Sequence, residues 1–196
     1  MIKRVFDLIF SLFGILLLSP LLLLIAILVK LTSKGGALFL QKRVGLNNVD
    51  FTMYKFRTMY VDSSQELMLT IGDGDKRITK FGSLLRRMKL DELPQLFNVL
   101  LGNMSLVGPR PEVRKYVDLY DSTQRQILSL KPGITDYASI AYSNENELLL
   151  RAPDPEKEYV ENILPQKIEL NMKYIAEQGI FTDIKIIGLT IKKILF

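Results

Sequence analysis

The sequence predicts a mostly helical protein that contains one small β-hairpin and begins with an apolar membrane helix. Three observations lead to this fold class. A run from Leu8 to Val29 contains no charged residue, several later segments repeat apolar residues at helical spacing, and one segment has the alternation of a hairpin. Because 196 residues suit one domain plus an appended segment, we expect an anchor at residues 1–34 and one folded domain at residues 35–196.

The apolar run is long enough for a helix that crosses the core of a bilayer. Ser19 and Pro20 lie near its middle, where proline removes a backbone hydrogen bond and kinks the helix. The Ser19 hydroxyl can then donate to the carbonyl that is freed. These features leave two topologies open: a helix that crosses the membrane straight, and one that turns at Ser19-Pro20 and returns.

Basic residues flank the apolar run on both sides, with Lys3 and Arg4 before it and Lys30, Lys34, Lys42 and Arg43 after it. The positive-inside rule therefore favours a cytoplasmic position for both ends. A secretory signal peptide fits poorly, because the run is too long and no small-residue cleavage site follows it.

Beyond the anchor, residues 39–60 alternate and contain β-prone side chains around the turn Gly45–Asn48, which predicts a hairpin. Helical spacing and helix-ending signals predict helices at 62–68, 80–89, 93–101, 112–130, 156–177 and 184–196. The segments 80–89 and 184–196 are basic and amphipathic. Such helices often lie on a membrane surface, although 80–89 fits an ordinary core-facing helix equally well.

The net charge of +5 predicts an anionic partner such as nucleic acid, acidic lipid or a phosphorylated substrate. The chain contains no Cys and no His. Their absence excludes thiolate nucleophiles, Cys-ligated zinc, histidine bases and Ser-His-Asp triads. Catalysis would therefore use carboxylates, Lys, Arg, Tyr, Ser or Thr, together with a hard cation bound by oxygen ligands.

The adjacent carboxylates Asp91 and Glu92 are the main candidates for chemistry. Pro94 predicts that a helix begins close to Asp91, because proline is tolerated in the first turn. Asp91 could then be only a helix cap. The basic residues Arg86, Arg87 and Lys89 come just before it. They should keep the Asp91 carboxylate ionised, so that it can attack phosphorus or hold a divalent metal.

Two basic motifs are candidates for binding phosphate. In an extended strand, Lys55 and Arg57 share one face and can contact neighbouring phosphate oxygens. Arg110 lies between Pro109 and Pro111, which restrict the backbone and hold the guanidinium for paired contacts with phosphate oxygens. Taken alone, the first motif also fits a solvated strand face, and the second fits an ordinary surface turn.

The order and spacing of these motifs resemble the bacterial sugar transferases, which are small monotopic polyprenyl-phosphate phosphoglycosyltransferases. The resemblance covers nearly the whole chain. The matching stretches are Lys3–Asp7, Ser19-Pro20, Gln41–Gly45, Tyr54–Met59, Leu90–Leu100, Met104–Pro111 and Lys131–Thr135.

The resemblance implies a role for each matching residue. Ser19-Pro20 corresponds to the break in a re-entrant helix, Asp91 to the nucleophile and Glu92 to its partner. The basic residues of the phosphate site correspond to Lys55, Arg86 and Arg110, to which the strand alternation adds Arg57. Mg²⁺ is the implied cofactor, with Asp91 as a candidate ligand.

The implied reaction transfers a sugar 1-phosphate from a UDP-sugar to polyprenyl (undecaprenyl) phosphate and releases UMP through a covalent aspartyl-phosphosugar, which initiates lipid-linked glycan assembly. The implied place is the bacterial inner membrane, where interfacial helices contact membrane lipids and the catalytic domain lies on the cytoplasmic face.

Two other functions stay open: direct displacement on the same substrates with Asp91 as a metal ligand, and a non-enzymatic adaptor that binds anionic lipids. A nucleic-acid partner is not expected, because no recognition motif is present. After Thr135 the segment 136–143 departs from the family pattern, so the identity of the sugar stays open, as does a homodimer.

Overall fold

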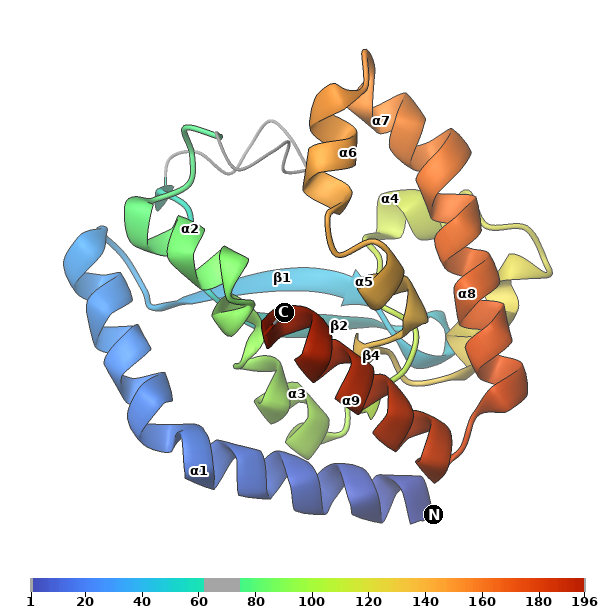
Figure 1. Ribbon diagram of the computed structural model, residues 1–196, viewed down its shortest axis with the longest axis horizontal. Helices are drawn as coiled ribbons and strands as arrows, with labels where there is room; N and C mark the ends of the chain where they lie inside the picture. The colour runs from blue at the N-terminus through green and yellow to red at the C-terminus, as the bar shows by residue number, and fades with distance from the viewer. Residues whose placement is uncertain (1, 62–74, 196) are drawn as a thin grey trace.

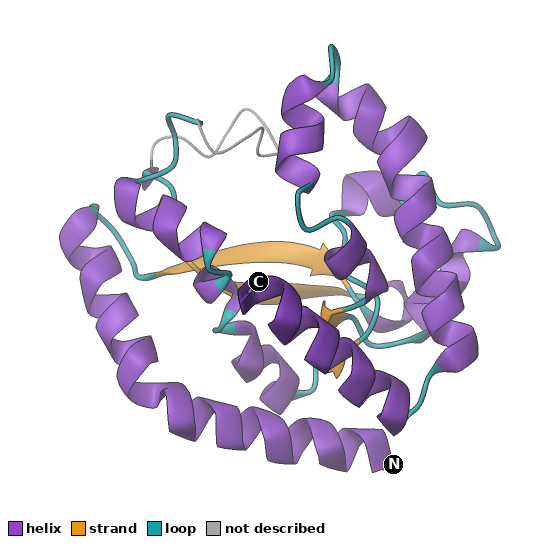
Figure 2. Ribbon diagram, viewed as in Figure 1, coloured by secondary structure: helices purple, strands orange, loops and turns teal. Residues whose placement is uncertain are grey.

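The computed structural model describes residues 2–61 and 75–195. Within these ranges, helices predominate over two small sheets of two strands each (Figure 2). Strands β1 (Leu38–Val44) and β2 (Asp50–Phe56) form an antiparallel hairpin, which confirms the predicted hairpin. The second sheet pairs β3 (Ser105–Val107) with β4 (Gly133–Thr135) in parallel, and the sequence did not predict it.

Helix α1 (Ile2–Thr32) contains the whole apolar run. It is long and apolar enough to cross a membrane, and only 17% of its most apolar 18-residue window is buried, which is too little for a core helix. The helix bends in its middle (Figure 1), and Pro20 lies inside it. The Ser19 hydroxyl donates to the carbonyl oxygen of Leu16 over 2.8 Å. Leu16 is the carbonyl that Pro20 leaves without its usual helical donor, so the predicted local repair is confirmed.

The N-terminal end of α1 is bonded to the rest of the protein. The Lys3 ammonium lies 2.5 Å from an Asp183 carboxylate oxygen and donates to the Val107 carbonyl over 3.0 Å. The Arg4 guanidinium donates to the Val99 carbonyl over 2.6 Å, at the end of a neighbouring helix. The two basic residues that suggested a cytoplasmic N-terminus are therefore occupied by contacts with the folded domain.

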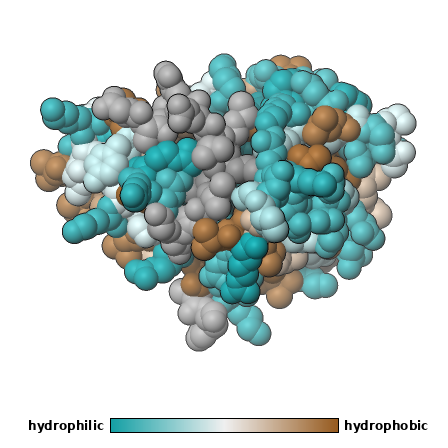
Figure 3. Space-filling model, turned by 90° about the horizontal axis from the view of Figure 1, so that it is seen from above, coloured by the Kyte–Doolittle hydropathy of each residue, from teal (hydrophilic) through white to brown (hydrophobic). Residues whose placement is uncertain are grey.

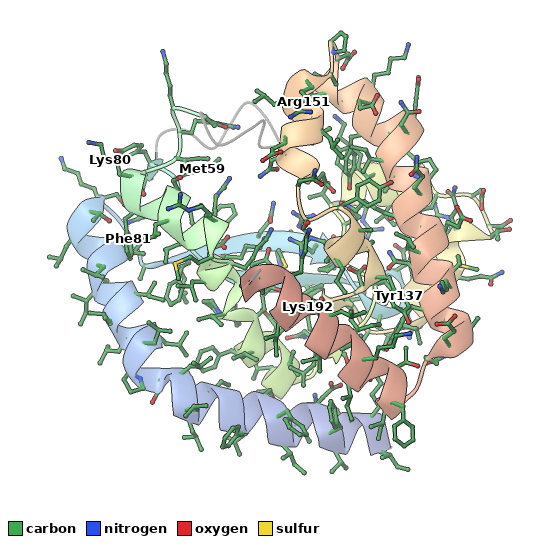
Figure 4. All side chains as sticks on the ribbon, in the orientation of Figure 1. Met59, Lys80, Phe81, Tyr137, Arg151 and Lys192 are labelled. Carbon is green, nitrogen blue, oxygen red and sulfur yellow. The ribbon has the colours of Figure 1, made fainter. Side chains whose placement is uncertain are left out.

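Two short helices follow the hairpin and pack on the inner side of α1: α2 (Lys80–Arg87) and α3 (Gln95–Leu101). Leu85 of α2 is buried in one cluster with Ile25 and Val29 of α1, and Phe81 packs against the same cluster (Figure 4). Leu84 and Met88 remain exposed. The segment predicted at 80–89 is therefore core-facing on one side and carries exposed apolar residues on another.

The remaining helices form the part of the domain on the right of Figure 1. They are α4 (Arg114–Val117), α5 (Tyr137–Ala141), α6 (Glu145–Arg151), α7 (Pro155–Glu158), α8 (Leu164–Glu177) and α9 (Ile180–Leu195). A π-helical turn at Tyr159–Ile163 joins α7 to α8 and confirms a nearly continuous helical segment at the predicted 156–177. The predicted helix at 184–196 begins four residues earlier, at Ile180.

The helix predicted at 112–130 is wrong. The structure has the short helix α4 and then a 3-10 helix at Gln124–Ser129. Between them, the Asp121 carboxylate accepts from the Gln124 amide N–H over 2.8 Å, and the Gln124 side chain accepts from the Asp121 amide over 3.0 Å. These local bonds replace helical ones. The helix predicted at 62–68 and most of the loop at 72–75 lie outside the described residues.

Candidate functional site

Glu92 lies where three separate segments of the chain meet. It ends a 3-10 turn, Leu90–Glu92, that follows α2. One of its carboxylate oxygens accepts from the Lys55 ammonium over 2.9 Å and from the Arg110 guanidinium over 2.6 Å. The other oxygen lies 3.4 Å from a second Arg110 nitrogen. The structure therefore brings Glu92 together with two of the predicted phosphate-site residues, Lys55 of the strand and Arg110 of the Pro-Arg-Pro loop.

These contacts determine the charge of Glu92. Burial would raise the pKa of its carboxyl, but Arg110 and Lys55 outweigh burial and hold that pKa well below its ordinary value. In return, the Glu92 charge raises the pKa of Arg110 against the effect of burial. Burial lowers the pKa of Lys55, and Glu92 opposes this only in part. Glu92 is thus a fixed negative charge at neutral pH.

Asp91 has a different environment from its neighbour. Its side chain is buried, and no described residue donates a hydrogen bond to its carboxylate. Burial, followed by the charge of Glu92, raises the pKa of Asp91, while Lys55 and Arg86 oppose the shift. Helix α3 begins after Pro94 without a side-chain cap, so the interpretation of Asp91 as a helix cap is wrong.

The loop that carries Arg110 is fixed by its neighbours. The Arg110 amide donates to the Asp136 carboxylate over 3.1 Å, and the Pro109 carbonyl accepts from the Gly133 amide over 3.0 Å. Gly108 and Gly133 allow this close approach, because a Cβ on Gly133 would lie 2.1 Å from the Gly108 nitrogen. The loop therefore presents Arg110 from a rigid support on β4.

The two other predicted phosphate-binding residues have different positions. The Arg86 Nε donates to the Thr58 hydroxyl over 2.8 Å, and the Arg86 charge lowers the pKa of Asp91, which places it on the Asp91 side of the site. The structure does not bring Arg57 to the dyad, which is the pair of carboxylates Asp91 and Glu92. Strand β2 ends at Phe56, and the Arg57 guanidinium donates to the Ser33 carbonyl over 2.9 Å, next to the end of α1. Arg57 therefore holds the C-terminal end of α1.

Arg43 is a further cation beside the site that the sequence did not single out. Its guanidinium donates to the Pro111 carbonyl over 3.1 Å and to the Gln41 side chain over 3.0 Å. Burial lowers the pKa of Arg43. The negative charge of Glu112 opposes this decrease, and the positive charge of Arg110 lowers the pKa further. Gln41 and Arg43 alternate along β1 in the same way as Lys55 and Arg57 do, which is the signal that could have identified them.

A buried ionic network supports the loop from behind. The Glu112 carboxylate accepts from the Tyr159 hydroxyl over 2.6 Å and from the Lys167 ammonium over 3.3 Å. Lys167 also donates to Glu145 over 3.0 Å. Burial would raise the pKa of Glu112, but Lys167 and Arg43 hold it below its ordinary value. Because Glu112 comes two residues after Arg110, this network anchors the site.

The chain is similar to known proteins over nearly its whole length. The model of the bacterial sugar transferase family matches residues 1–196. The chain is 40% identical, over 99% of its length, to the UDP-N-acetylgalactosamine-undecaprenyl-phosphate N-acetylgalactosaminephosphotransferase of Aeromonas hydrophila. It is 42% identical, again over 99%, to the undecaprenyl-phosphate glucose phosphotransferase of Komagataeibacter xylinus. It spans 44% and 36% of the lengths of these two relatives.

A shorter relative matches over most of its own length. The chain is 38% identical to the uncharacterized sugar transferase EpsL of Bacillus subtilis and covers 87% of that protein. The family match at residues 1–196 includes the segments that carry Asp91 and Glu92, the hairpin and the Pro-Arg-Pro loop. The chain belongs to the bacterial sugar transferase family.

Proposed function

We propose that the chain transfers a sugar 1-phosphate from a UDP-sugar to polyprenyl phosphate, with undecaprenyl phosphate as the acceptor. One observation carries this proposal. The Lys55 and Arg110 cations converge on Glu92 directly beside Asp91, a buried carboxylate that accepts no hydrogen bond from a described residue. The two relatives above, which are named as undecaprenyl-phosphate sugar phosphotransferases, support the same substrates.

In the proposed first step, an Asp91 oxygen attacks the phosphorus that carries the sugar. A new bond forms between phosphorus and the carboxylate oxygen, the bond to the bridging oxygen breaks, and its electron pair leaves with UMP. Lys55 and Arg110 bind the diphosphate oxygens and offset their negative charge. Arg86, on the Asp91 side, lowers the repulsion between the nucleophile and the phosphates.

In the proposed second step, an oxygen of the lipid phosphate attacks the same phosphorus. The bond between phosphorus and Asp91 breaks, so the carboxylate is restored and the sugar phosphate is joined to the lipid. Glu92 stays charged throughout, because Lys55 and Arg110 hold its pKa low. Its role is then to fix the two cations, which leaves Asp91 as the carboxylate that reacts.

Mg²⁺ is the cofactor we propose for this site. Among the described residues no group of three or more acidic side chains could hold a metal. Mg²⁺ commonly binds through one or two carboxylates plus substrate phosphates, so Asp91 with the diphosphate fits this ion. When bound, it would supply positive charge to the phosphate oxygens.

We also propose that α1 enters the membrane and returns, with both ends on the cytoplasmic face of the inner membrane. Lys3 and Arg4 bond the first turn of α1 to the folded domain, and Arg57 bonds the residue after its last turn. Both ends are therefore attached to one folded domain. The bend in Figure 1 and the bond from Ser19 to Leu16 support the same topology.

The surface agrees with this placement. Along the lower edge of Figure 4, the side chains of α1 project away from the domain. On the face seen from above in Figure 3, opposite that edge, hydrophilic residues predominate and apolar ones are scattered.

The experiment uses a UDP-sugar labelled with ³²P in the phosphate next to the sugar. Without acceptor, we expect the label to become attached to the protein and UMP to be released in an equal amount. Addition of undecaprenyl phosphate should move the label to lipid. Asp91→Asn should abolish both events. UMP release that requires acceptor and never labels the protein would indicate direct displacement, and full activity of Asp91→Asn would contradict a catalytic role of this site.

A further inference from the structure

Strand β1 begins with three consecutive exposed apolar residues. Leu38, Phe39 and Leu40 are 47%, 41% and 59% exposed. In the part of the chain that the structure describes, β2 is the only strand paired with β1, so these residues lie on an open edge. An exposed apolar run on an open strand edge is a liability unless something covers it.

Of the three residues, Phe39 lies on the side of the hairpin that carries the site. The strand register pairs Phe39 with Lys55, and residues directly opposite each other in antiparallel strands project from the same face, with Cβ atoms about 5 Å apart. The Lys55 ammonium lies 2.9 Å from Glu92. Leu38 and Leu40 project from the other face, because alternate residues of a strand point in opposite directions.

The face that carries Phe39 changes in character along β1. Phe39 is followed on this face by Gln41 and then by Arg43, whose guanidinium bonds the Pro111 carbonyl beside Arg110. At about 3.3 Å per residue, the distance from Phe39 to Arg43 is roughly 13 Å. The face therefore runs from an exposed aromatic ring to a cluster of cations over the length of a lipid phosphate and its first isoprene units.

The start of β1 lies next to the end of the membrane helix. Leu38 pairs with Phe56, and the next residue, Arg57, donates to Ser33 just beyond the end of α1. On the face that it shares with Leu38, opposite to that of Phe39, Phe56 is buried with Ile25 and Val29 of α1. An acyl or isoprenyl chain that leaves the bilayer near the end of α1 would therefore meet the start of β1 before it reached Arg43 and Arg110.

We propose that Phe39 binds the isoprene units next to the phosphate of the acceptor lipid, and that the lipid phosphate lies on the same face, from the Lys55 ammonium toward Arg110. This inference rests on the proposed function and adds a residue that selects the acceptor. The occupant is an isoprenyl chain, because Phe39 is an exposed apolar side chain near the start of β1, next to the end of α1, and the cations on the same face suit a phosphate. A nucleobase, or the bilayer surface alone, would give different results in the test below.

The test compares Phe39→Ser with Phe39→Leu and with Leu40→Ser, which changes an equally apolar neighbour on the opposite face. Steady-state UMP release in detergent gives apparent KM values for the UDP-sugar and for undecaprenyl phosphate. We expect Phe39→Ser to raise the KM for the acceptor about tenfold, as loss of one aromatic contact would, and to leave the donor KM unchanged. Phe39→Leu and Leu40→Ser should stay near wild type.

Two further measurements locate the contact. With a three-isoprene phosphate acceptor, the effect of Phe39→Ser should persist, because only units next to the phosphate touch the ring; an effect confined to long acceptors would overturn the proposal. Sedimentation with phospholipid vesicles that lack acceptor should be the same for Phe39→Ser and wild type. Weaker sedimentation of Phe39→Ser would assign Phe39 to the bilayer surface and overturn the proposal.

Other outcomes also overturn it. A raised KM for the UDP-sugar would indicate contact with the nucleotide, and an equal effect of Leu40→Ser would indicate a general apolar surface. If the wild-type protein releases UMP and Phe39→Ser has the same KM values, only this inference fails. If the wild-type protein releases no UMP with any UDP-sugar and undecaprenyl phosphate, the proposed function fails as well.

Discussion

Arg110 and Glu92, which are 18 residues apart in the sequence, face each other through two guanidinium nitrogens and two carboxylate oxygens, at 2.6 Å and 3.4 Å. The Arg110 side chain is 31% exposed, whereas that of Glu92 is 13% exposed. The buried carboxylate thus orients a cation whose outer part is still accessible. In the proposed reaction, the diphosphate would meet a guanidinium already held in place, at little entropic cost.

Arg110→Lys should therefore reduce activity although the positive charge is kept. A lysine has one nitrogen and cannot contact Glu92 and two phosphate oxygens side by side. We expect kcat/KM for UMP release to fall about 100-fold, the usual effect of losing an oriented donor at a reacting group. Arg114→Lys is the matched control, because Arg114 pairs on the surface with Asp50. If both variants lose activity equally, the loss does not come from the site.

The different environments of the two carboxylates predict a dependence on pH. Burial and the charge of Glu92 raise the pKa of Asp91, so kcat/KM should rise with pH through a value above the ordinary aspartate pKa, as Asp91 becomes ionised. Glu92→Gln removes the neighbouring negative charge and frees two cations, and both changes lower the pKa of Asp91. The acid limb of log kcat/KM against pH should then move to lower pH.

The exposed residue Glu161 provides the control for this shift, since Glu161→Gln should leave the acid limb in place. The measurement is the pH profile of each variant, whatever its absolute rate. An acid limb that stays at the same pH in Glu92→Gln would show that it does not report Asp91 coupled to Glu92.

The dyad and its cations could be predicted because each depends on a short local signal. Asp91 and Glu92 precede Pro94, and Arg110 lies between two prolines, so local backbone restriction marks both segments. The alternation pattern predicted that Arg57 shares a face with Lys55. It could not show that β2 ends at Phe56. Beyond that residue the Arg57 side chain reaches Ser33, next to the end of α1, and not Glu92.

The support behind the site could not be predicted from local patterns. Glu112 and Lys167 are separated by 55 residues, and each alone looks like an ordinary surface charge. Strands β3 and β4 have three residues each, too few for an alternation to be recognised. Both features depend on tertiary packing. Only the fold shows that a carboxylate just after the Pro-Arg-Pro turn is buried with a lysine of α8.

Glu112→Gln should destabilise the protein. It removes the charge that Lys167, itself buried, is paired with, and breaking a buried pair from one side costs about 3 kcal/mol. Thermal or denaturant unfolding in detergent measures the difference. The pair of Lys115 with Glu156 is exposed on both sides, so Glu156→Gln should change stability little. Equal stability of Glu112→Gln and wild type would contradict a supporting role for this network.

The lowered pKa of Glu112 also predicts how the stability of the protein depends on pH. Lys167 and Arg43 hold the pKa of Glu112 below its ordinary value in the folded protein. A depressed carboxyl pKa stabilises the folded state above the pKa of the unfolded chain, and that contribution is lost as pH falls through the folded pKa. The stability advantage of wild type over Glu112→Gln should therefore be complete near pH 7 and shrink under acid conditions.

The chain contains no Cys, which makes the topology of α1 directly measurable. Ile2→Cys and Lys34→Cys each introduce one thiol, at exposed positions at the two ends of the helix. Leu119→Cys introduces a thiol in the folded domain, where Leu119 is 58% exposed. Because bonds from Lys3 and Arg4 hold the N-terminal end against this domain, all three thiols should react with a membrane-impermeant maleimide from the same side. We expect no labelling in intact cells and full labelling in inverted membrane vesicles. A straight crossing would instead expose Ile2→Cys to the reagent outside intact cells, while Lys34→Cys and Leu119→Cys stayed protected. It would also require the bonds of Lys3 to Asp183 and of Arg4 to Val99 to be broken in the membrane.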